Sequence, residues 1–469
     1  MTIYDTDLDL RTATPMAQSW GAHLRATLVL GIPMVGAQIA QLGINTTDVI
    51  IIGQLGAVPL AAIVLAAQFF FNIFIFGAGL AVAVVPMVAQ AYGRGDTVST
   101  RRSVRMGMWA AICYAVFATP LFLNAESIWL AMGQKAEVAA LAAQYVHVSQ
   151  FGLLPALLFA VLRAFVGGIG RAGVILYVTV ATLVLNAVLA YGLVLGHYGL
   201  PALGMFGASM VAVMVQWCSF FFLVGYIQSR PGTRAYELFV RFWRPDWPAF
   251  GEVVRLGLPV GITMLAEVSL FAAGSLLMGR ISTLQLAAHG IAIQLASLVF
   301  MIPLGLSQAA TVRVGIAHGQ GDHGNLVRAA ITVVVISSVC SVLGTILFLL
   351  YPYQLGSLFI DNGAPNAPEV LRLAVPLILV AGIFQWVDGV QAVVAGLLRG
   401  LKDARMPMVI ALISYWPIGF MLAWVLAFPL GFGGVGVWLG FLLGLFSAAV
   451  MLSIRFVLKV AHERRLLPA

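Results

Sequence analysis

The chain has 469 residues, of which 61% are hydrophobic and only 9% are charged, and its mean hydropathy is +1.01. These values exclude a soluble globular domain, in which about a quarter of the residues are charged. The formal charge of +8 would suit a nucleic-acid partner only if the basic residues shared one surface, and they are instead spread over several short segments. The composition therefore predicts a polytopic helical membrane protein with no nucleic-acid partner.

Twelve apolar stretches are long enough to cross about 30 Å of hydrocarbon as helices. They cover residues 24–52, 57–90, 104–123, 138–161, 173–195, 203–228, 253–279, 284–311, 327–350, 371–397, 407–427 and 433–457. The predicted fold class is an all-α polytopic membrane protein with twelve transmembrane helices in two pseudo-symmetric six-helix lobes. The predicted parts are an arm at 1–23, an N-lobe at 24–228, a linker at 229–252, a C-lobe at 253–457 and a tail at 458–469.

The lysines and arginines predict the orientation of these helices. All of them except Lys135, Arg280 and Arg372 are assigned to the arm, the even-numbered connections or the tail, and Arg163, Arg313 and Arg399 are among those assigned to connections. This count includes five arginines that lie inside a span, within three residues of its end: Arg25, Arg105, Arg255, Arg328 and Arg455. Cytoplasmic loops collect positive residues. The arm also lacks the positively charged start of a cleaved signal peptide. We therefore expect a multi-pass protein of the inner (plasma) membrane with both termini in the cytoplasm.

The two halves of the chain carry an internal repeat. A shift of 226 residues places Gly31 and Pro33 on Gly257 and Pro259, and it aligns two Gly-containing loops. These loops are Gly93-Arg94-Gly95-Asp96 and Gly319-Gln320-Gly321-Asp322. Because each half holds six spans, the halves have the same orientation and an axis along the membrane normal should relate them. A cavity between the two lobes is the expected transport site.

Only three carboxylates lie deep inside the apolar stretches: Asp48, Glu267 and Asp388. An ionised acid at the centre of a bilayer costs roughly 2.5–3.5 kcal/mol on insertion scales, so it persists where it faces a cavity, an ion or a partner. A neutral amide would join helices at lower cost, which favours a functional role for the acids. The three acids predict a cation path, with Glu267 and Asp388 as candidate ligands of Na⁺ or carriers of a proton.

Polar side chains accompany each acid at helical spacing. They are Gln38, Gln41 and Asn45 before Asp48, Thr263 before Glu267, and Gln385 and Gln391 around Asp388. His289 and Gln294 are further candidates for the wall of a cavity, although a packed imidazole and a structural amide are the simpler interpretations. Asn186 is likewise expected to join helices by a hydrogen bond. Cys113, Cys218 and Cys340 lie in apolar stretches, so we expect neither disulfides nor zinc.

Four motifs carry a resemblance to a known family: Thr46-Thr47-Asp48 with Gly53, Val85 to Gln90, Glu267 to Phe271, and Phe384 to Gln391 followed by Gly396, Arg399, Gly400, Lys402 and Asp403. With these motifs the chain resembles the multidrug and toxic compound extrusion (MATE) family, in its NorM-like branch, over nearly the whole sequence. The resemblance implies a V-shaped antiporter that exports cationic amphiphilic drugs and dyes in exchange for Na⁺ or H⁺. It implies that Glu267 and Asp388 are the cation-binding acids of the C-lobe and Asp48 the acid of the N-lobe. Phe384 departs from the pattern, because similar sequences often have Tyr there.

Other functions leave different signatures in a sequence. A lipid or lipid-linked-sugar flippase would line a similar two-lobed cavity with cationic residues to hold phosphate, whereas the embedded charges here are acidic. An intramembrane enzyme would need a catalytic motif such as HExxH or GxSxG, and ATP drive would need a Walker-type loop; the sequence contains none of these. A cation channel stays open as an alternative. We expect a monomeric transporter without a cofactor, coupled to Na⁺ or H⁺.

Overall fold

The structure is a computed structural model that describes residues 19–360 and 365–465, and within these ranges it contains helices and no strands. Twelve of the helical spans are long and apolar enough to cross a membrane, as predicted. In the N-lobe they are α1 (Trp20–Gly53), α2 (Ala57–Gly93), α3 (Thr97–Leu123), α5–η1–α6 (Ala136–Ser149, Gln150–Gly152, Leu153–Gly168), α7 (Ala172–Leu195) and α8 (Gly204–Ser229). In the C-lobe they are α10 (Trp247–Ile281), α11 (Thr283–Gln320), α12 (His323–Leu350), α14 (Ala367–Gly400), α15–η2–α16 (Arg405–Ile413, Ser414–Phe420, Met421–Ala427) and α17 (Gly433–Arg465). The short helices α4 (Ala125–Ala131), α9 (Pro231–Arg234) and α13 (Pro352–Ser357) lie between spans.

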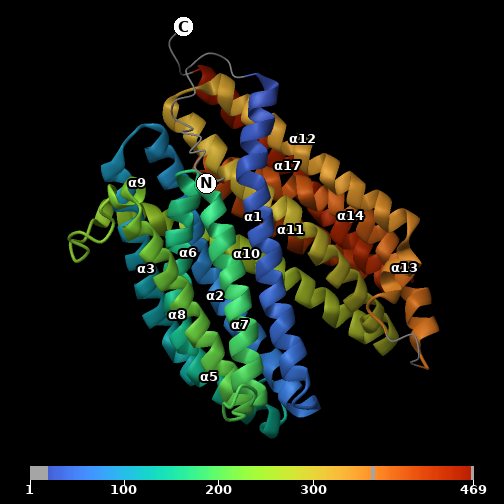
Figure 1. The fold of residues 1–469 in the computed structure, drawn as a ribbon. Helices are drawn as coiled ribbons and strands as arrows, with labels where there is room; N and C mark the ends of the chain where they lie inside the picture. Colours follow the sequence, from blue (N-terminus) through green and yellow to red (C-terminus); the bar gives the residue numbers. More distant parts are fainter. Residues whose placement is uncertain (1–18, 361–364, 466–469) are drawn as a thin grey trace.

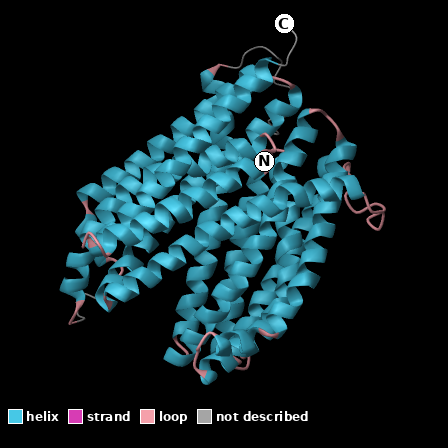
Figure 2. Ribbon diagram, turned by 180° about the vertical axis from the view of Figure 1, so that it is seen from behind, coloured by secondary structure: helices cyan, strands magenta, loops and turns pink. Residues whose placement is uncertain are grey.

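The two groups of helices form a V (Figures 1 and 2). They meet at the end of the molecule where α1 begins, α17 ends and the connection between α8 and α10 lies, which we call the linker end. They diverge toward the opposite, open end, where α13 caps the C-lobe and the α7–α8 connection caps the N-lobe (Figure 1). Each lobe has its own apolar core, and smaller clusters that combine α1 with α11 join the lobes. The predicted two-lobed all-α fold is confirmed.

Several helices extend beyond the apolar stretches that predicted them. α10 begins at Trp247, inside the predicted linker, and α17 continues to Arg465, into the predicted tail. Most of the predicted arm, residues 1–18, and the end of the predicted tail, residues 466–469, lie outside the described residues.

The assignment of Arg163, Arg313 and Arg399 to connections is wrong. The three residues lie within α6, α11 and α14. A hydropathy scan ends a span where polar residues begin, whereas the helices run on toward the linker end as protein-packed segments. The structure therefore contains arginines inside its helices that the sequence pattern placed in loops.

The two loops aligned by the repeat have the same structure. Gly95 and Gly321 both adopt left-handed backbone conformations, with φ of 73° and 72°. Asp96 then caps α3 by accepting a hydrogen bond from the Ser99 amide, and Asp322 caps α12 in the same way. A glycine that ends one helix and an aspartate that starts the next explain why this sequence pattern recurs.

Two spans are interrupted where proline removes a helical hydrogen bond. The span predicted at 138–161 contains a 3₁₀ turn at Gln150–Gly152, just before Pro155. The span predicted at 407–427 widens to a π-helix at Ser414–Phe420, which contains Pro417. Such a π segment often lies at a functional site, and this one includes Tyr415, which is fully buried in the C-lobe.

Candidate functional site

Glu267 and Asp388 lie on helices of the C-lobe that run in opposite directions. Phe271, one turn beyond Glu267 on α10, contacts Phe384, one turn before Asp388 on α14, with ring centroids 6.1 Å apart. Both acids are therefore one turn from this aromatic contact, on its linker-end side. The two carboxylates lie at the same depth and within electrostatic range of each other.

The carboxylates of this pair have oxygens without hydrogen bonds. Asp388 is only 5% exposed, and its buried Oδ1 has no hydrogen-bond partner among residues 19–360 and 365–465. Glu267 is partly buried and forms no hydrogen bond within the same ranges. Since buried polar atoms are normally bonded, such oxygens call for an explanation. Two neighbouring acids of this kind have the donor chemistry to share a proton or hold a monovalent cation.

The positively charged Arg399 and the neutral Tyr415 lie near the pair. Both lie within electrostatic range of Glu267. Arg399 follows Asp388 by three turns on the same face of α14, and its Nη2 donates to Ser307 Oγ at 2.8 Å. Sequence reasoning missed Arg399 as part of the site because it was assigned to a loop. The eleven-residue spacing from Asp388, three helical turns, is the signal that identifies it.

The predicted companions of the C-lobe acids are mostly bonded to the protein. Gln391 Nε2 donates to the Tyr415 hydroxyl at 2.8 Å, and Gln385 Nε2 donates to the Ala296 carbonyl at 2.7 Å. Thr263 donates its hydroxyl to the Pro259 carbonyl of its own helix. Gln391 thus connects α14 to the π segment that carries Tyr415, and Gln385 fixes α14 against α11.

Phe384 and His289 belong to a buried aromatic cluster. Phe384 is 1% exposed and makes edge contacts with Phe271 and with Trp438 of α17. Trp438 Nε1 donates to His289 Nδ1 at 3.1 Å, so that this nitrogen is an acceptor. His289 is thus packed and bonded through one ring nitrogen, while its buried Nε2 has no hydrogen-bond partner among residues 19–360 and 365–465. Gln294, one and a half turns further along α11, is exposed and lies outside the cluster.

Asp48 forms a separate site in the N-lobe. It lies within two turns of the end of α1, nearer the open end than the other two acids. Asn186 Nδ2 of α7 donates to Asp48 Oδ1 at 2.7 Å, and Asn186 is itself buried. Sequence reasoning gave Asn186 only a structural role. The burial of an amide in an otherwise apolar span is the signal that it serves the acid.

The other polar residues before Asp48 are not equivalent. Gln38 accepts a hydrogen bond at 2.9 Å from Arg163 of α6, which also donates to Gln308 of α11 at 3.3 Å. Gln38 therefore lies where the lobes meet. Gln41 is partly buried, and Asn45, closer to the open end, is exposed. These polar residues thus lie along α1 from the junction of the lobes to Asp48.

Glycines bring the two lobes into backbone contact near the linker end. On α10, a Cβ added at Gly261 would lie 2.5 Å from the Phe76 carbonyl oxygen of α2, and one added at Gly257 would lie 2.7 Å from Leu80 Cα. A side chain at Gly305 of α11 would likewise meet the backbone of Val35 on α1, at 2.6 Å. Only glycine permits this approach.

Hydrogen bonds between the lobes surround this glycine contact. The buried Arg313 of α11 donates to Thr27 and to the His23 carbonyl, both on α1. Gln90 of α2 donates to the Gly400 carbonyl at 2.9 Å. Together with the Arg163 contacts, these bonds fasten the lobes at the linker end.

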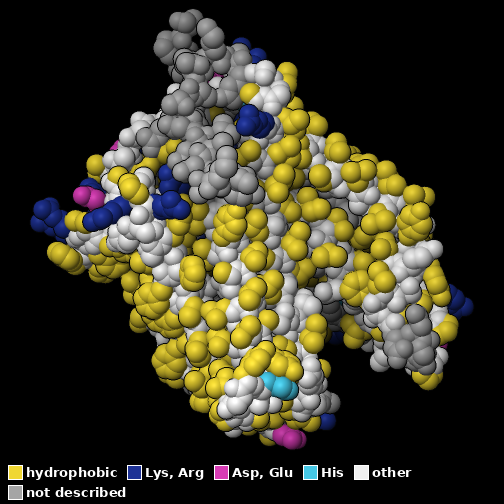
Figure 3. Space-filling view, in the orientation of Figure 1, with side chains coloured by type: hydrophobic (Ala, Val, Ile, Leu, Met, Phe, Trp, Pro, Cys, Tyr) yellow, Lys and Arg dark blue, Asp and Glu magenta, His cyan; other side chains and the backbone are white. Residues whose placement is uncertain are grey.

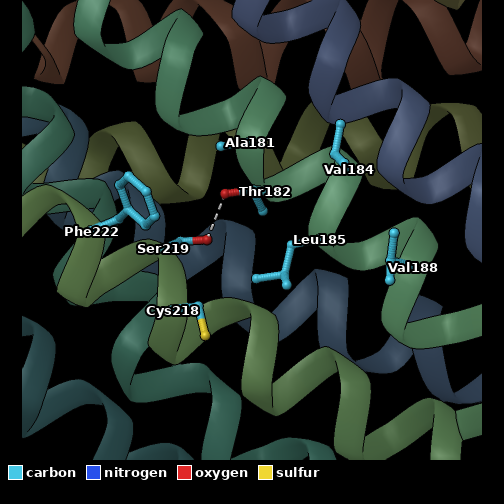
Figure 4. Close-up of a pocket in the computed structure, with 8 residues that line it drawn as sticks. All are labelled: Ala181, Thr182, Val184, Leu185, Val188, Cys218, Ser219 and Phe222. Atoms are coloured by element: carbon cyan, nitrogen blue, oxygen red, sulfur yellow. Dashed lines mark hydrogen bonds between the residues drawn. The ribbon is translucent and has the colours of Figure 1, made fainter. Parts of the chain in front are cut away.

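The surface is hollowed between the lobes at the open end (Figure 3). A separate pocket of about 470 Å³ lies between α7 and α8 (Figure 4). Its lining is apolar apart from the Thr182 and Ser219 hydroxyls, which are 2.8 Å apart. None of the three acids lines it, so the candidate site for a cation is elsewhere. Within the described residues, no group of three or more His, Cys, Asp or Glu side chains could hold a metal ion.

Comparison with known proteins gives concordant matches. The family model MatE matches residues 33–192 and 259–425. The chain is 64% identical over 447 residues to a probable multidrug resistance protein NorM of Agrobacterium fabrum, covering 95% of this chain and 96% of the relative. A protein of the same description from Rhizobium meliloti is 60% identical and covers 93% of this chain and 94% of the relative.

Solved structures match the fold. A eukaryotic MATE transporter superposes with a TM-score of 0.84 at 21% identity, over 95% of this chain and 99% of that one. An outward-facing multidrug resistance MATE family transporter superposes with a TM-score of 0.85 at 20% identity, over 94% of this chain and 96% of that one.

Proposed function

Because the chain belongs to the MatE family, whose members are transporters and not enzymes, we propose that it is a multidrug efflux antiporter that exports cationic amphiphilic compounds in exchange for Na⁺ or H⁺. The observation that carries this proposal is the pair of C-lobe acids, Glu267 and Asp388, which lie at one depth and have oxygens without hydrogen bonds. A fixed negative site of this kind attracts a coupling cation and a cationic drug alike.

The proposed mechanism is competition between the two cations. When the coupling ion or proton neutralises the acids, the affinity of the site for a positively charged drug falls and the drug is released. The exchange requires only that each ligand binds the two states of the protein differently, because a ligand with equal affinity for both states shifts nothing. The ion gradient then sets the direction of transport.

The junction of the lobes is the part of the protein that must change between two states, one with the linker end closed and one with it open. In the structure the lobes are fastened at the linker end by the glycine contact and by Arg163 and Arg313. For a drug to enter from that side, these contacts must break while the open end closes. We place the linker end in the cytoplasm, since its connections carry most of the positive residues.

The buried arginines bear on the alternative of a flippase. Embedded positive charges do exist, contrary to the simple sequence argument, but Arg163 and Arg313 are bonded to α1 and Arg399 to Ser307. All three lie toward the linker end and are held by protein groups. For Arg163 and Arg313 this arrangement supports a structural role better than a role as a phosphate cradle. Arg399 also lies within electrostatic range of Glu267, so its charge is directed to the acidic site, and this favours export of cations.

Efflux of ethidium from proteoliposomes tests the proposal, with a Na⁺ gradient and a pH gradient imposed separately. Asp388→Asn should abolish efflux under whichever gradient drives the wild type. The matched control is Glu369→Gln, which removes an exposed carboxylate from the same helix and should leave efflux intact. Efflux that continues in Asp388→Asn at the wild-type rate would contradict the assignment of the C-lobe pair. Dye flux that responds to no ion gradient would indicate a channel.

A further inference from the structure

The connection between α8 and α10 is an ordered segment that packs on α3. Glu237 pairs with Arg101 at 2.8 Å, and Asp246 pairs with Arg102. In addition, the Val240 carbonyl accepts a hydrogen bond from an α3 arginine, and the Phe242 carbonyl accepts one from an α3 tryptophan. We call residues 230–247 the docked linker.

This packing leaves the arginines of the docked linker without counter-ions. Its two acids are both paired with α3. The side chains of Arg230, Arg234, Arg241 and Arg244 are exposed, and none forms an ion pair or hydrogen bond with another residue of 19–360 or 365–465. Figure 3 shows Lys and Arg side chains gathered on this side of the molecule. The docked linker therefore carries positive charge that no described protein group neutralises.

Large apolar side chains lie among these arginines. Trp243 is 72% exposed and Trp247 is 68% exposed, although both are near residues that pack closely on α3. Arg241 has a φ of 54°, a left-handed conformation that is uncommon for a residue with a Cβ. The bonds of the neighbouring Val240 and Phe242 to α3 hold this conformation. An uncommon backbone conformation that neighbouring contacts hold in place is a recurrent feature of functional loops.

We propose that the docked linker binds the headgroup of an anionic phospholipid, with Arg241 and Arg244 holding the phosphate and Trp243 and Trp247 lying at the headgroup boundary. The planar guanidinium forms paired hydrogen bonds to phosphate oxygens. Tryptophan favours the boundary between hydrocarbon and water, where one end of the ring is apolar and the other is wet. The segment joins the ends of two spans, so it lies at the level where headgroups are found.

Native mass spectrometry of the full-length protein in detergent, titrated with phosphatidylglycerol or phosphatidylcholine, tests the proposal. Wild type should retain phosphatidylglycerol in preference to phosphatidylcholine. The double variant Arg241→Gln/Arg244→Gln should bind phosphatidylglycerol roughly 30-fold more weakly, from the usual contribution of two arginines near an anionic surface. The control is Arg280→Gln/Arg372→Gln, which removes two exposed arginines at the open end and should bind as wild type does.

Several results would overturn the proposal. They are equal retention of the two lipids by wild type, equal binding by wild type and the linker variant, or an equal loss in the control. Competition by millimolar inorganic phosphate together with no preference between lipids would assign the site to free phosphate. Trp243→Ala/Trp247→Ala provides a second test. This variant should retain phosphatidylglycerol more weakly than wild type, and inorganic phosphate should not displace the lipid. None of these measurements uses a drug or an ion gradient, so the result is independent of the proposed antiport.

Discussion

Gly261→Ala should loosen the junction of the lobes at the linker end. The added Cβ would lie 2.5 Å from the Phe76 carbonyl oxygen, whereas ordinary contact begins at 3.4 Å, so α2 and α10 must separate by up to about 0.9 Å. Overpacking of this size typically costs about 1–3 kcal/mol. The cost falls on the state seen here, in which the linker end is closed. The ratio of closed to open forms should therefore drop by roughly 5- to 150-fold.

The helix propensity of alanine does not obscure this effect. Alanine favours a helix over glycine by up to about 1 kcal/mol, but α10 is helical in the closed form and should stay so in the open form. Gly251→Ala is the matched control, because a Cβ at Gly251, on the same helix, has nothing within 4 Å. It adds the same methyl group to α10 without touching the other lobe.

Pulsed electron paramagnetic resonance measures the outcome. Spin labels at Val98→Cys of α3 and Val327→Cys of α12, both exposed, report the distance between the lobes at the linker end. The native cysteines are replaced with serine. Gly261→Ala should increase the population at longer distances, and Gly251→Ala should leave the distribution unchanged. If Gly261→Ala gave the wild-type distribution, the glycine contact would not control the opening of this end.

Three further predictions concern single side chains. Asn186→Leu should reduce drug efflux, since it leaves the Asp48 carboxylate without its 2.7 Å donor. Efflux equal to that of wild type in the proteoliposome assay would contradict this. Arg399→Gln should lower the Na⁺ or H⁺ concentration needed for half-maximal coupling by several-fold, because it removes a positive charge that lies near Glu267; an unchanged or higher concentration would count against that role. The hydrogen bond from its α3 arginine holds the pKa of Asp246 below its ordinary value of 3.8, so the part of the linker's stabilisation that comes from Asp246 is present above pH 4 and is lost as pH falls further. Pepsin should therefore cut the linker faster at pH 2.5 than at pH 4.5, relative to an unstructured peptide. The same ratio at both pH values would show that Asp246 does not hold the linker.

The sequence predicted the spans and the repeat because both depend on local chemistry. Twenty apolar residues cross a bilayer wherever they occur. The pairs Gly95–Asp96 and Gly321–Asp322 specify a helix end and a cap without help from distant residues. The fold class followed from these signals and from the resemblance to MATE proteins.

The partners of the acids depend on long-range packing and were not predicted. Asn186 lies 138 residues from Asp48 in the chain, and only the packing of α7 on α1 brings them together. Tyr415 lies in the C-lobe site because it belongs to a π segment. The pattern of apolar residues does not indicate where a π segment occurs or which side chains it directs inward. Hydropathy also placed Arg399 in a loop, because a scan detects where hydrocarbon ends and not where a helix ends. The roles of the predicted site residues stay predictions.

In the proposed mechanism a coupling cation and a cationic drug compete through Glu267 and Asp388. The most direct test is equilibrium binding of ethidium to the purified protein as Na⁺ concentration and pH are varied independently. Na⁺ or H⁺ should weaken ethidium binding, and ethidium should weaken binding of that ion by the same factor. Asp388→Asn should remove the dependence of ethidium binding on the ion, and Glu369→Gln should keep it. Ethidium affinity that is the same at every Na⁺ concentration and pH, or that depends on the ion equally in wild type and Asp388→Asn, would contradict competition at this pair of acids.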